Sequence, residues 1–401
     1  MPTCRVVFMR ILLVHNFYGS SAPSGENEVF KLEREMLERN GHEVATYIRC
    51  SDEIRKGNAL ARAWGKIKGA FSAIGNPFAA MTVAKKCREF KPDVVHFHNA
   101  FPLISPLAVR AASKYAPVVM TLHNYRTACV AGVPTMHGKV CSLCLDKKCV
   151  WDGIKNRCYR DSLFATLPLA INIALYRQRL PKWVSRFIVL SEFQKRKMVE
   201  YGLPEKRIAV KGNYVAQIQH PRSVEKKDSF IYVGRLSDEK GIQTLVKAWR
   251  LMERDAPSLL LVGDGIGRSR YEQLAEGLPI KFLGQRIHTE VMDLVADAKA
   301  IVQPSVCWET FGLAVVEAAR MGTPGIVSNS GALPFLVQDG KLGEVFEVGN
   351  AESLVAAVKR LLARPDYDEM CVAARREAEE KYSEKANYCR LMEVYGEVVG
   401  L

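Results

Sequence analysis

The sequence predicts an α/β protein built from two doubly wound units, and three observations lead to this prediction. Short apolar runs rich in β-branched residues alternate with helical patterns along both halves of the chain. This rhythm is typical of parallel sheets that are covered by helices on both faces. The rhythm lapses in the polar, proline-containing segment 217–228 and then restarts. A length of 401 residues suits two or three domains.

In the first half, five short apolar runs are expected to be strands, and helical patterns separate most of them. The clearest helix is predicted over Glu26–Asn40, with Gly41 as the residue that ends it. The chain from Met9 reads as a cleaner start to the first strand than the chain from Met1, so residues 1–8 are interpreted as an extension. The five runs are Ile11–His15, Val44–Ile48, Val94–Phe97, Val118–Leu122 and Phe187–Leu190.

In the second half, five more strands and a final helix over Glu384–Val399 are expected. The predicted organisation is therefore a first domain over residues 1–216 with a cysteine-rich insert at 126–160, a second domain over 229–383, and a helix over 384–401. The five runs are Phe230–Val233, Leu259–Val262, Ile280–Leu283, Ala300–Val302 and Gly325–Val327.

The composition is that of a soluble globular protein, with 48% hydrophobic and 25% charged residues. No run reaches the roughly 20 apolar residues of a membrane span. The longest candidate, Leu163–Tyr176, is interrupted by Pro168 and Asn172. The start of the chain does not read as a signal peptide. Eleven cysteines without such a signal favour the reducing cytosol.

Charge is distributed unevenly along the chain. Residues 1–224 carry 35 Lys and Arg against 16 Asp and Glu, a net charge of +19, whereas residues 225–401 carry 22 against 27, a net charge of −5. Such asymmetry indicates an anionic partner for the first half. Phospholipid, a lipid-phosphate acceptor and nucleic acid all meet this description.

The stretch from Pro304 to Glu317, PSVCWETFGLAVVE, carries the most specific chemistry. A helix that begins near Gly312 directs unpaired backbone N–H groups and a partial positive charge toward Glu309, which makes a phosphate site. Glu317 lies roughly 7–8 Å further along the same helix. Two acids that flank a phosphate site match a nucleotide-sugar, which has a diphosphate between a sugar and a ribose.

This stretch resembles the Glu-x7-Glu signature of the family 4 glycosyltransferases. Further segments are similar to that family's in the same order: DVVHFHN at 93–99, TLHNYR at 121–126, YVGRLSDEKG at 232–241, VGDG at 262–265 and FLG at 282–284. The resemblance implies the GT-B fold, in which two Rossmann-like domains face across a cleft and the last helix returns to the first domain. It also implies a retaining reaction.

The resemblance implies roles for residues of the second domain. Arg235 and Lys240 follow its first strand and match the positions that bind the donor diphosphate, and their positive charges suit the leaving phosphate. The amides of Phe311, Gly312 and Leu313 face the same phosphates, and Glu309 lies at the donor sugar as a catalytic residue. Glu317 accepts hydrogen bonds from the ribose hydroxyls. Gly265 and Arg286 are expected to border the nucleoside.

In the first domain, His123 ends a strand, and the resemblance assigns it a catalytic position beside the donor sugar. His96 is interpreted as structural, and His98 is left open between a structural and a functional role. Gly25 opens a helix after the first strand and is a candidate for close backbone approach to the diphosphate. The spacing of the glycines does not match a dinucleotide fingerprint.

Two features limit the match. After Ser330-Gly331 the family usually has a second glycine and then an acid, and here Ala332 and Phe335 occupy those positions. The turn is expected to survive without a donor contact from the acid. Asp366 and Asp368 mimic the metal-binding acids of other transferases, but they follow Pro365 at an expected helix start and are interpreted as structural. No cofactor is expected for catalysis beyond the nucleotide-sugar donor, a UDP- or GDP-sugar.

The cysteine-rich insert contains a C-x2-C pair with the spacing of a zinc knuckle. One interpretation is a structural zinc held by Cys129, Cys141, Cys144 and either Cys149 or Cys158, because a loop of about 30 residues without a core needs a constraint. Reduced, packed cysteines and disulfides remain the alternatives.

Residues 54–88 contain eight Lys and Arg and no acid. Within them, large apolar residues recur at helical spacing between basic residues. Such a helix either lies on an anionic membrane or buries its stripe in the core of its own domain. The segment Leu163–Tyr176 leaves the same alternatives. The stripe consists of Leu60, Trp64, Ile67, Phe71 and Ile74.

Together these patterns predict a cytoplasmic glycosyltransferase, peripheral at the cytoplasmic face of the membrane, that acts on a lipid-linked or polysaccharide acceptor in cell-surface glycan assembly. The alternatives are another GT-B enzyme, such as a nucleotide-sugar epimerase or a sugar phosphorylase, and a non-catalytic basic module that binds membrane or nucleic acid. The last alternative leaves Glu309, Glu317, Arg235 and Lys240 without a role, so no nucleic-acid partner is expected.

Overall fold

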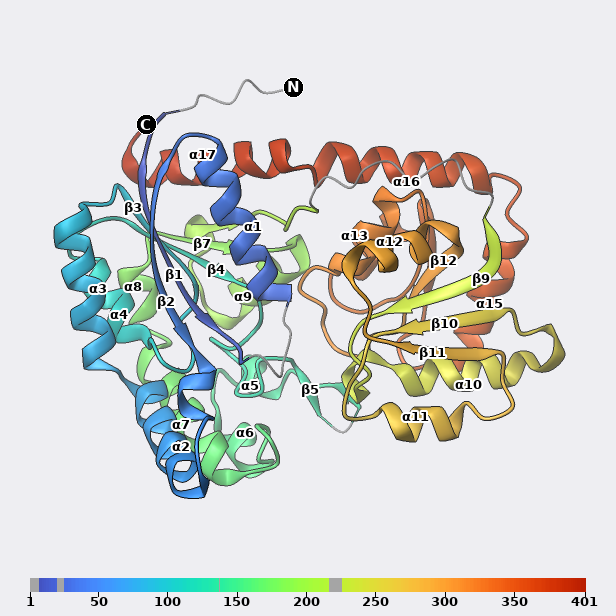
Figure 1. Ribbon diagram of the computed structural model, residues 1–401, viewed down its shortest axis with the longest axis horizontal. Helices are drawn as coiled ribbons and strands as arrows, with labels where there is room; N and C mark the ends of the chain where they lie inside the picture. The colour runs from blue at the N-terminus through green and yellow to red at the C-terminus, as the bar shows by residue number, and fades with distance from the viewer. Residues whose placement is uncertain (1–6, 20–24, 137, 216–225) are drawn as a thin grey trace. The chain divides into compact units, whose positions relative to one another are not determined.

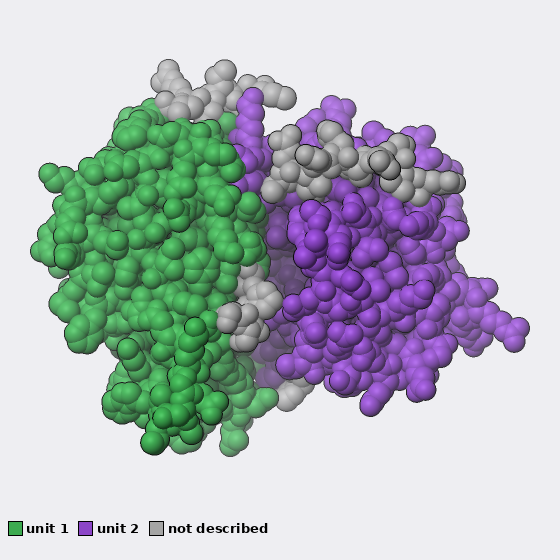
Figure 2. Space-filling view, in the orientation of Figure 1, with its two compact units in different colours: residues 1–134, 142–213, 387–401 green, residues 135–141, 214–386 purple. Residues whose placement is uncertain are grey.

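The computed structural model describes residues 7–19, 25–136, 138–215 and 226–401, and the chain divides into two compact units (Figures 1 and 2). The amino-terminal unit comprises residues 1–134, 142–213 and 387–401, and the carboxyl-terminal unit comprises 135–141 and 214–386. The first boundary thus precedes the expected one, and a short piece of the cysteine-rich insert is grouped with the second unit. The predicted linker, 217–228, lies mostly outside the described residues, as do residues 1–6 of the predicted extension.

The amino-terminal unit is built on a six-stranded, fully parallel sheet with the order β2-β1-β3-β4-β7-β8. The strand order reverses between β1 and β3, and ligands bind at such switch points beyond the carboxyl ends of the strands. The five expected strands are present, and β8 was not expected. The strands are β1 (Arg10–Phe17), β2 (Glu43–Cys50), β3 (Val94–Asn99), β4 (Val118–Leu122), β7 (Arg186–Val189) and β8 (Ile208–Val210).

Helices connect the strands of the amino-terminal unit. Helix α1 (Gly25–Arg39) follows β1 and ends as predicted, because Gly41 adopts a φ of +85° and donates its N–H to the carbonyl of Glu38. The insert forms two short helices and a β5–β6 hairpin, and the hairpin is the piece grouped with the carboxyl-terminal unit. The remaining elements are α2 (Ala59–Ile74), α3 (Pro77–Phe90), α4 (Pro106–Ala112), β5 (Thr135–Met136), β6 (Lys139–Val140), α5 (Leu143–Asp146), α6 (Trp151–Lys155), α7 (Leu163–Tyr176), α8 (Leu180–Trp183) and α9 (Glu192–Tyr201).

The carboxyl-terminal unit repeats the design with a second parallel sheet, in the order β11-β10-β9-β12-β13-β14. The order reverses between β9 and β12, so the loops that follow these two strands meet at the carboxyl edge of the sheet. Strand β14 was not expected. The strands are β9 (Lys227–Val233), β10 (Ser258–Val262), β11 (Ile280–Gly284), β12 (Ala298–Gln303), β13 (Gly325–Ser328) and β14 (Gly343–Phe346).

Helices cover both faces of this sheet and enclose two apolar clusters, one around Trp249 and Tyr271 and the other around Met292 and Val295. The last helix, α17, has the bounds predicted from the sequence, and most of it belongs to the amino-terminal unit. The helices are α10 (Ile242–Met252), α11 (Arg268–Leu274), α12 (His288–Asp297), α13 (Leu313–Arg320), α14 (Leu333–Leu336), α15 (Ala351–Leu362), α16 (Tyr367–Lys381) and α17 (Glu384–Val399).

The predicted α/β class, with two Rossmann-like units, is confirmed. Residues Ile11 to Val14 of β1 are fully buried, as expected for a central strand covered on both faces. Among the described residues, no helix combines the length and the apolar character that crossing a bilayer requires.

Candidate functional site

In the carboxyl-terminal unit, the sequence motifs meet at an ion pair between Lys240 and Glu309. The Nζ atom of Lys240 lies 2.5 Å from Oε1 of Glu309, and Oγ of Ser305 donates to the same oxygen at 2.7 Å. The side chains of Lys240 and Glu309 are only 19% and 13% exposed. Burial is the largest single contribution and by itself would raise the pKa of Glu309, but the Lys240 charge and the hydrogen bonds from Lys240 and Ser305 together hold this pKa below its usual value. The glutamate is therefore ionised at neutral pH.

Gly241 explains why lysine and glutamate meet. Its φ is +73°, and a Cβ atom at this position would lie 1.8 Å from the carbonyl oxygen of Pro304. Only glycine permits this approach of the two loops that follow β9 and β12. Arg235, in the first of these loops, is 62% exposed and pairs with Glu239 at 3.2 Å. Its charge also acts to lower the pKa of Glu309.

The predicted helix terminus is present. Gly312 is the N-cap of α13 with a φ of +98°, and a Cβ atom there would lie 2.8 Å from the side chains of Leu333 and Leu336. Phe311 is buried, and its ring packs edge-on against Tyr382 at 5.4 Å. The first amides of α13, from Gly312 and Leu313 onward, have no acceptor within the helix. That they bind an anion beside Glu309 stays a prediction.

Glu317 lies in the second turn of α13, and its carboxylate contacts a residue that sequence reasoning did not identify. The Nε2 atom of His288, the first residue of α12, lies 3.0 Å from Oε1 of Glu317. The Glu317 side chain is 15% exposed. The only signal in the sequence was the position of His288 just after Arg286. Arg286 itself is exposed, and its expected contact with the nucleoside stays a prediction.

Close packing of the backbone requires the two glycines of the VGDG segment, Gly263 and Gly265. A Cβ atom on Gly265 would lie 2.4 Å from the carbonyl oxygen of Leu236, and one on Gly263 would lie 1.9 Å from that of Gly234. They bring the loop after β10 against the segment that carries Arg235. A nucleoside contact from Gly265 stays a prediction.

The loop of Ser330 and Gly331 fixes the backbone of Glu309. Gly331 has a φ of +67°, and a Cβ atom there would lie 2.4 Å from the backbone N and O of Glu309. The amide of Ala332 donates to the Glu309 carbonyl at 2.9 Å, and Oγ of Ser330 donates to the carbonyl of Cys307 at 2.7 Å. The turn thus persists without the second glycine. Phe335, at the position of the missing acid, is exposed.

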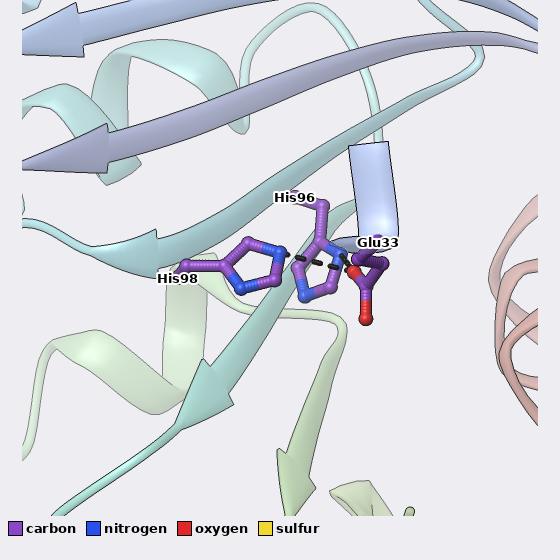
Figure 3. Close-up of side chains that lie close together, drawn as sticks. All are labelled: Glu33, His96 and His98. Carbon is purple, nitrogen blue, oxygen red and sulfur yellow. Dashed lines mark ion pairs between the residues drawn. The ribbon is translucent and has the colours of Figure 1, made fainter. Parts of the chain in front are cut away.

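In the amino-terminal unit, His123 follows β4 and is the outermost member of a buried polar network. Its Nε2 atom lies 3.1 Å from Nδ1 of His98, and the two rings stack. Nε2 of His98 in turn lies 3.0 Å from Oε1 of Glu33, on α1 (Figure 3). The His98–Glu33 contact is within ion-pair distance but lacks hydrogen-bond geometry, so it does not assign a tautomer to either ring.

Lys211 balances the charge of this network. Its ammonium group lies 2.9 Å from Oε2 of Glu33 and donates to Asn387 of α17 at 3.0 Å. Burial is the largest single contribution and by itself would raise the pKa of Glu33, but the charges of Lys211, His98 and His96 together hold this pKa well below its usual value. Burial lowers the pKa of His123 far below its usual value, and the charge of His98 acts in the same direction. His123 is therefore neutral at pH 7.

His96 is structural, as expected, because its two ring nitrogens contact the hydroxyls of Tyr395 and Thr121 at 2.7 and 2.8 Å. Glu33, His96 and His98 also form the only group of three or more potential metal ligands within 4.8 Å of one another among the described residues. Because Lys211 already supplies the positive charge beside Glu33, this set does not favour a cation.

Glu26 is a second residue that sequence reasoning missed, although Gly25 beside it was considered. Glu26, His123 and Arg126 line a cavity of about 90 Å³ beyond the carboxyl ends of β3 and β4. Burial raises the pKa of Glu26 to about 7, and the Arg126 charge only partly opposes this shift. Perturbed acids in cavities are common at functional sites. Gly25 has no positive φ and no atom where a Cβ would lie, so its role in binding diphosphate stays a prediction.

The described cysteines form no disulfide with one another, and no three of them bring their sulfur atoms within 4.8 Å. A small apolar cluster supports the insert instead: Val150 and Ile154 pack against Val130 and Leu169. This cluster gives the insert an apolar support of its own. The zinc site at Cys129, Cys141, Cys144 and Cys158 stays a prediction.

Family models match both units. Residues 216–381 match the model of glycosyl transferases group 1, and residues 29–215 match that of glycosyltransferase family 4. Among curated proteins, the chain is 27% identical over 398 residues to glycogen synthase of Mycobacterium tuberculosis, covering 89% of this chain and 87% of that protein. It is 25% identical over 363 residues to the putative teichuronic acid biosynthesis glycosyltransferase TuaC of Bacillus subtilis, covering 82% and 83%.

Solved structures share the fold. A glycosyltransferase from Rickettsia africae superposes with a TM-score of 0.68 at 19% identity, over 98% of this chain and 99% of that one. HepE of Anabaena, solved in complex with UDP, superposes with a TM-score of 0.66 at 17% identity, over 97% and 100%. The predicted GT-B fold and enzyme class are confirmed. Since the two family models together span residues 29–381, the chain belongs to glycosyltransferase family 4.

Proposed function

We propose that the protein is a retaining glycosyltransferase that uses a UDP- or GDP-sugar. Its acceptor is a lipid-linked or polysaccharide molecule in the assembly of a cell-surface glycan. The enzyme works as a peripheral protein at the cytoplasmic face of a membrane. The observation that carries the proposal is the buried Lys240–Glu309 pair beside the amino terminus of α13.

Several relatives support the nucleotide-sugar and the acceptor class. HepE of Anabaena has been solved with UDP and with UDP-glucose. TuaC of Bacillus subtilis is described as acting in teichuronic acid biosynthesis. A phosphatidyl-myo-inositol mannosyltransferase of Mycobacterium leprae is 31% identical over 170 residues, which is 41% of this chain. The first of these favours a UDP-sugar, and the other two favour cell-surface and lipid-linked acceptors.

The proposed chemistry follows from the arrangement around Glu309. The bond between the sugar C1 and the leaving phosphate breaks, the acceptor oxygen bonds to C1 on the same face, and the acceptor proton passes to the phosphate. Negative charge grows on the diphosphate, where Lys240, Arg235 and the α13 amides supply preset positive charge and donors. Glu309 is ionised and stabilises the positive charge that develops on the sugar. These groups suffice for this charge balance, so no metal ion is expected in the reaction.

Two measurements test the proposal. A thermal-shift screen of UDP, GDP and ADP should give a rise in Tm for UDP or GDP, because a ligand that binds only the native state stabilises it. The NMR coupling constant of the anomeric proton in the product should then show the configuration of the donor sugar. No shift with any nucleotide would remove the proposed activity. Conversion of the donor without an acceptor would indicate an epimerase, and a requirement for inorganic phosphate would indicate a phosphorylase.

A further inference from the structure

Helix α2 shows an inverted arrangement of large and small residues. Its buried face is formed by Gly65, Gly69, Ser72 and Ala73. A Cβ atom on Gly65 would lie 2.3 Å from the carbonyl oxygen of Ile54, and one on Gly69 would lie 2.7 Å from the Ile54 side chain. The helix therefore packs closely through its small residues.

The large apolar residues of α2 consequently face outward. Trp64 is 70% exposed, Phe71 is 69% exposed and Ile67 is 46% exposed. Of the two alternatives that the sequence left open, burial of this stripe in the core of its own domain is wrong for these residues. A face with this much exposed apolar surface marks an interaction site rather than an ordinary solvated helix.

Helix α7 lies next to the exposed apolar face of α2 and forms the other wall of a pocket. It packs beside α2 in the amino-terminal unit (Figure 1), and Nδ2 of Asn172 donates to the carbonyl of Ala73 at 2.6 Å. A pocket of about 870 Å³ opens between the two helices and is lined by Ile67, Phe71, Phe164 and Leu169. This volume lies within the usual range for small-molecule sites.

The charge of the pocket is of one sign. Arg55, Arg62, Lys66 and Arg160 line it, and no acid lies among its lining residues. Apolar walls combined with four basic side chains suit an amphiphile whose polar end is anionic, because arginine and lysine recognise phosphate oxygens by charge-assisted hydrogen bonds. A neutral glycan would leave these charges unused, and an inorganic anion would leave the apolar walls unused.

The pocket adjoins the cavity that contains His123. Ala73, Phe101 and Leu169 line both, and the Arg126 guanidinium stacks on the Phe101 ring at 4.7 Å. An acceptor bound in the pocket through its lipid chain and phosphate would thus lie next to the histidine expected at the donor sugar. The shared wall connects binding of the lipid to the place of the reaction.

We propose that the pocket between α2 and α7 binds the acceptor as a lipid phosphate or diphosphate, with the phosphate on the basic side chains and the hydrocarbon chain against the exposed apolar residues. The inference rests on the proposed function and gives it a substrate class.

The experiment measures binding of decyl phosphate, below its critical micelle concentration, by calorimetry on the full chain. The test variant is Arg62→Glu/Lys66→Glu. The control, Lys85→Glu/Arg88→Glu, makes the same change in net charge on α3, away from the pocket. The test variant should lose about tenfold to hundredfold in affinity, and the control should match the wild type. Decanol and inorganic phosphate should each bind at least about tenfold more weakly than decyl phosphate.

A second variant, Phe164→Ser, changes a side chain that is 90% exposed and leaves the charge unchanged, so it should weaken decyl phosphate binding without affecting folding. Equal losses in the test and control variants, or binding only to vesicles of anionic lipid, would indicate general attraction to a membrane and overturn the inference. The Tm shift with UDP is read in parallel, so that failure of the donor proposal is distinguished from failure of the lipid pocket.

Discussion

Glu309 and Glu317 are both partly buried acids of the same segment, yet their partners differ. Lys240 and Ser305 hold Glu309 beside the helix terminus, whereas His288 contacts Glu317 a turn and a half away. Under the proposed function, each acid contacts a different part of the nucleotide-sugar. Their mutants should therefore separate binding from turnover.

Glu317→Ala should weaken binding of the nucleoside diphosphate about tenfold or more, because two accepted hydrogen bonds are lost. Glu309→Gln should bind it equally well or more tightly, since Lys240 is released from its ion pair, but kcat should fall at least about a hundredfold. Calorimetry and initial rates measure the two effects. The exposed Glu290→Ala serves as the control. If Glu309→Gln and Glu317→Ala changed nucleotide affinity and kcat in the same way, the different roles assigned to the two acids would be contradicted.

Glu26 should make stability depend on pH. Its pKa is raised from 4.5 to about 7 in the folded state, so between these values the folded protein binds a proton that the unfolded chain has lost. The free energy of unfolding should therefore fall as pH rises through this window, by up to about 1.4 kcal/mol per pH unit from this group. Urea titrations between pH 4.5 and 7.5 measure the slope.

Glu26→Gln should flatten this part of the profile. The control Glu28→Gln, two residues further along α1, removes an exposed carboxylate that pairs with Lys31 and should leave the slope unchanged. If the free energy of unfolding of the wild type did not fall in this pH range, the pKa of Glu26 would not be raised in the folded protein.

At the scale of elements, α2 shows how packing reverses what a helical pattern suggests. The spacing of its large residues predicts a helix correctly, but spacing alone does not say which face turns inward. Here Ile54 fits only against glycine. Gly65→Val should lower the free energy of unfolding by about 1–3 kcal/mol through the clash with Ile54.

Trp64→Ser removes a much larger side chain from the same helix, but from its exposed face, so it should change stability by no more than about 0.5 kcal/mol. Urea unfolding compares the two variants. A larger loss for the tryptophan than for the glycine would show that the stripe is buried.

The network of Glu33 and Lys211 joins α1, the end of β8 and α17 through buried charges. Lys211→Met should cost about 3–5 kcal/mol, because it leaves the Glu33 carboxylate buried without its counter-charge. The double variant Glu33→Gln/Lys211→Met should recover part of this loss, since neither charge then remains. A double-mutant cycle by urea unfolding gives the coupling, and additive losses would contradict it.

At the scale of the molecule, the alternation of strand and helix patterns predicted both units, the bounds of α7 and α17, and the loops that hold Arg235, Lys240 and Glu309. Local patterns are strong here because buried parallel strands are almost entirely apolar. Strand β8 was missed because three apolar residues before Lys211 give no periodicity. Glu33 was not singled out from the sequence, because only tertiary structure brings it to Lys211, 178 residues away. His288 and Glu26 were missed for the same reason.

The amino-terminal unit is discontinuous in the chain. Helix α17 supplies Asn387 to Lys211, Tyr388 to His42 and Tyr395 to His96. A fragment of residues 1–213 lacks these partners and should not unfold cooperatively by circular dichroism, whereas adding a peptide of residues 384–401 should restore a transition. Cooperative unfolding of the fragment alone would show that the helix is dispensable.

The same discontinuity bears on synthesis. While the nascent chain emerges from the ribosome, all strands of the first sheet are synthesised long before the helix that completes the unit. Until then, the ammonium group of Lys211 lacks its contact with the side-chain amide of Asn387. Final consolidation of the first half is thus deferred until residues 387–401 have been synthesised. A stop codon before residue 387 should consequently inactivate the half that was made first.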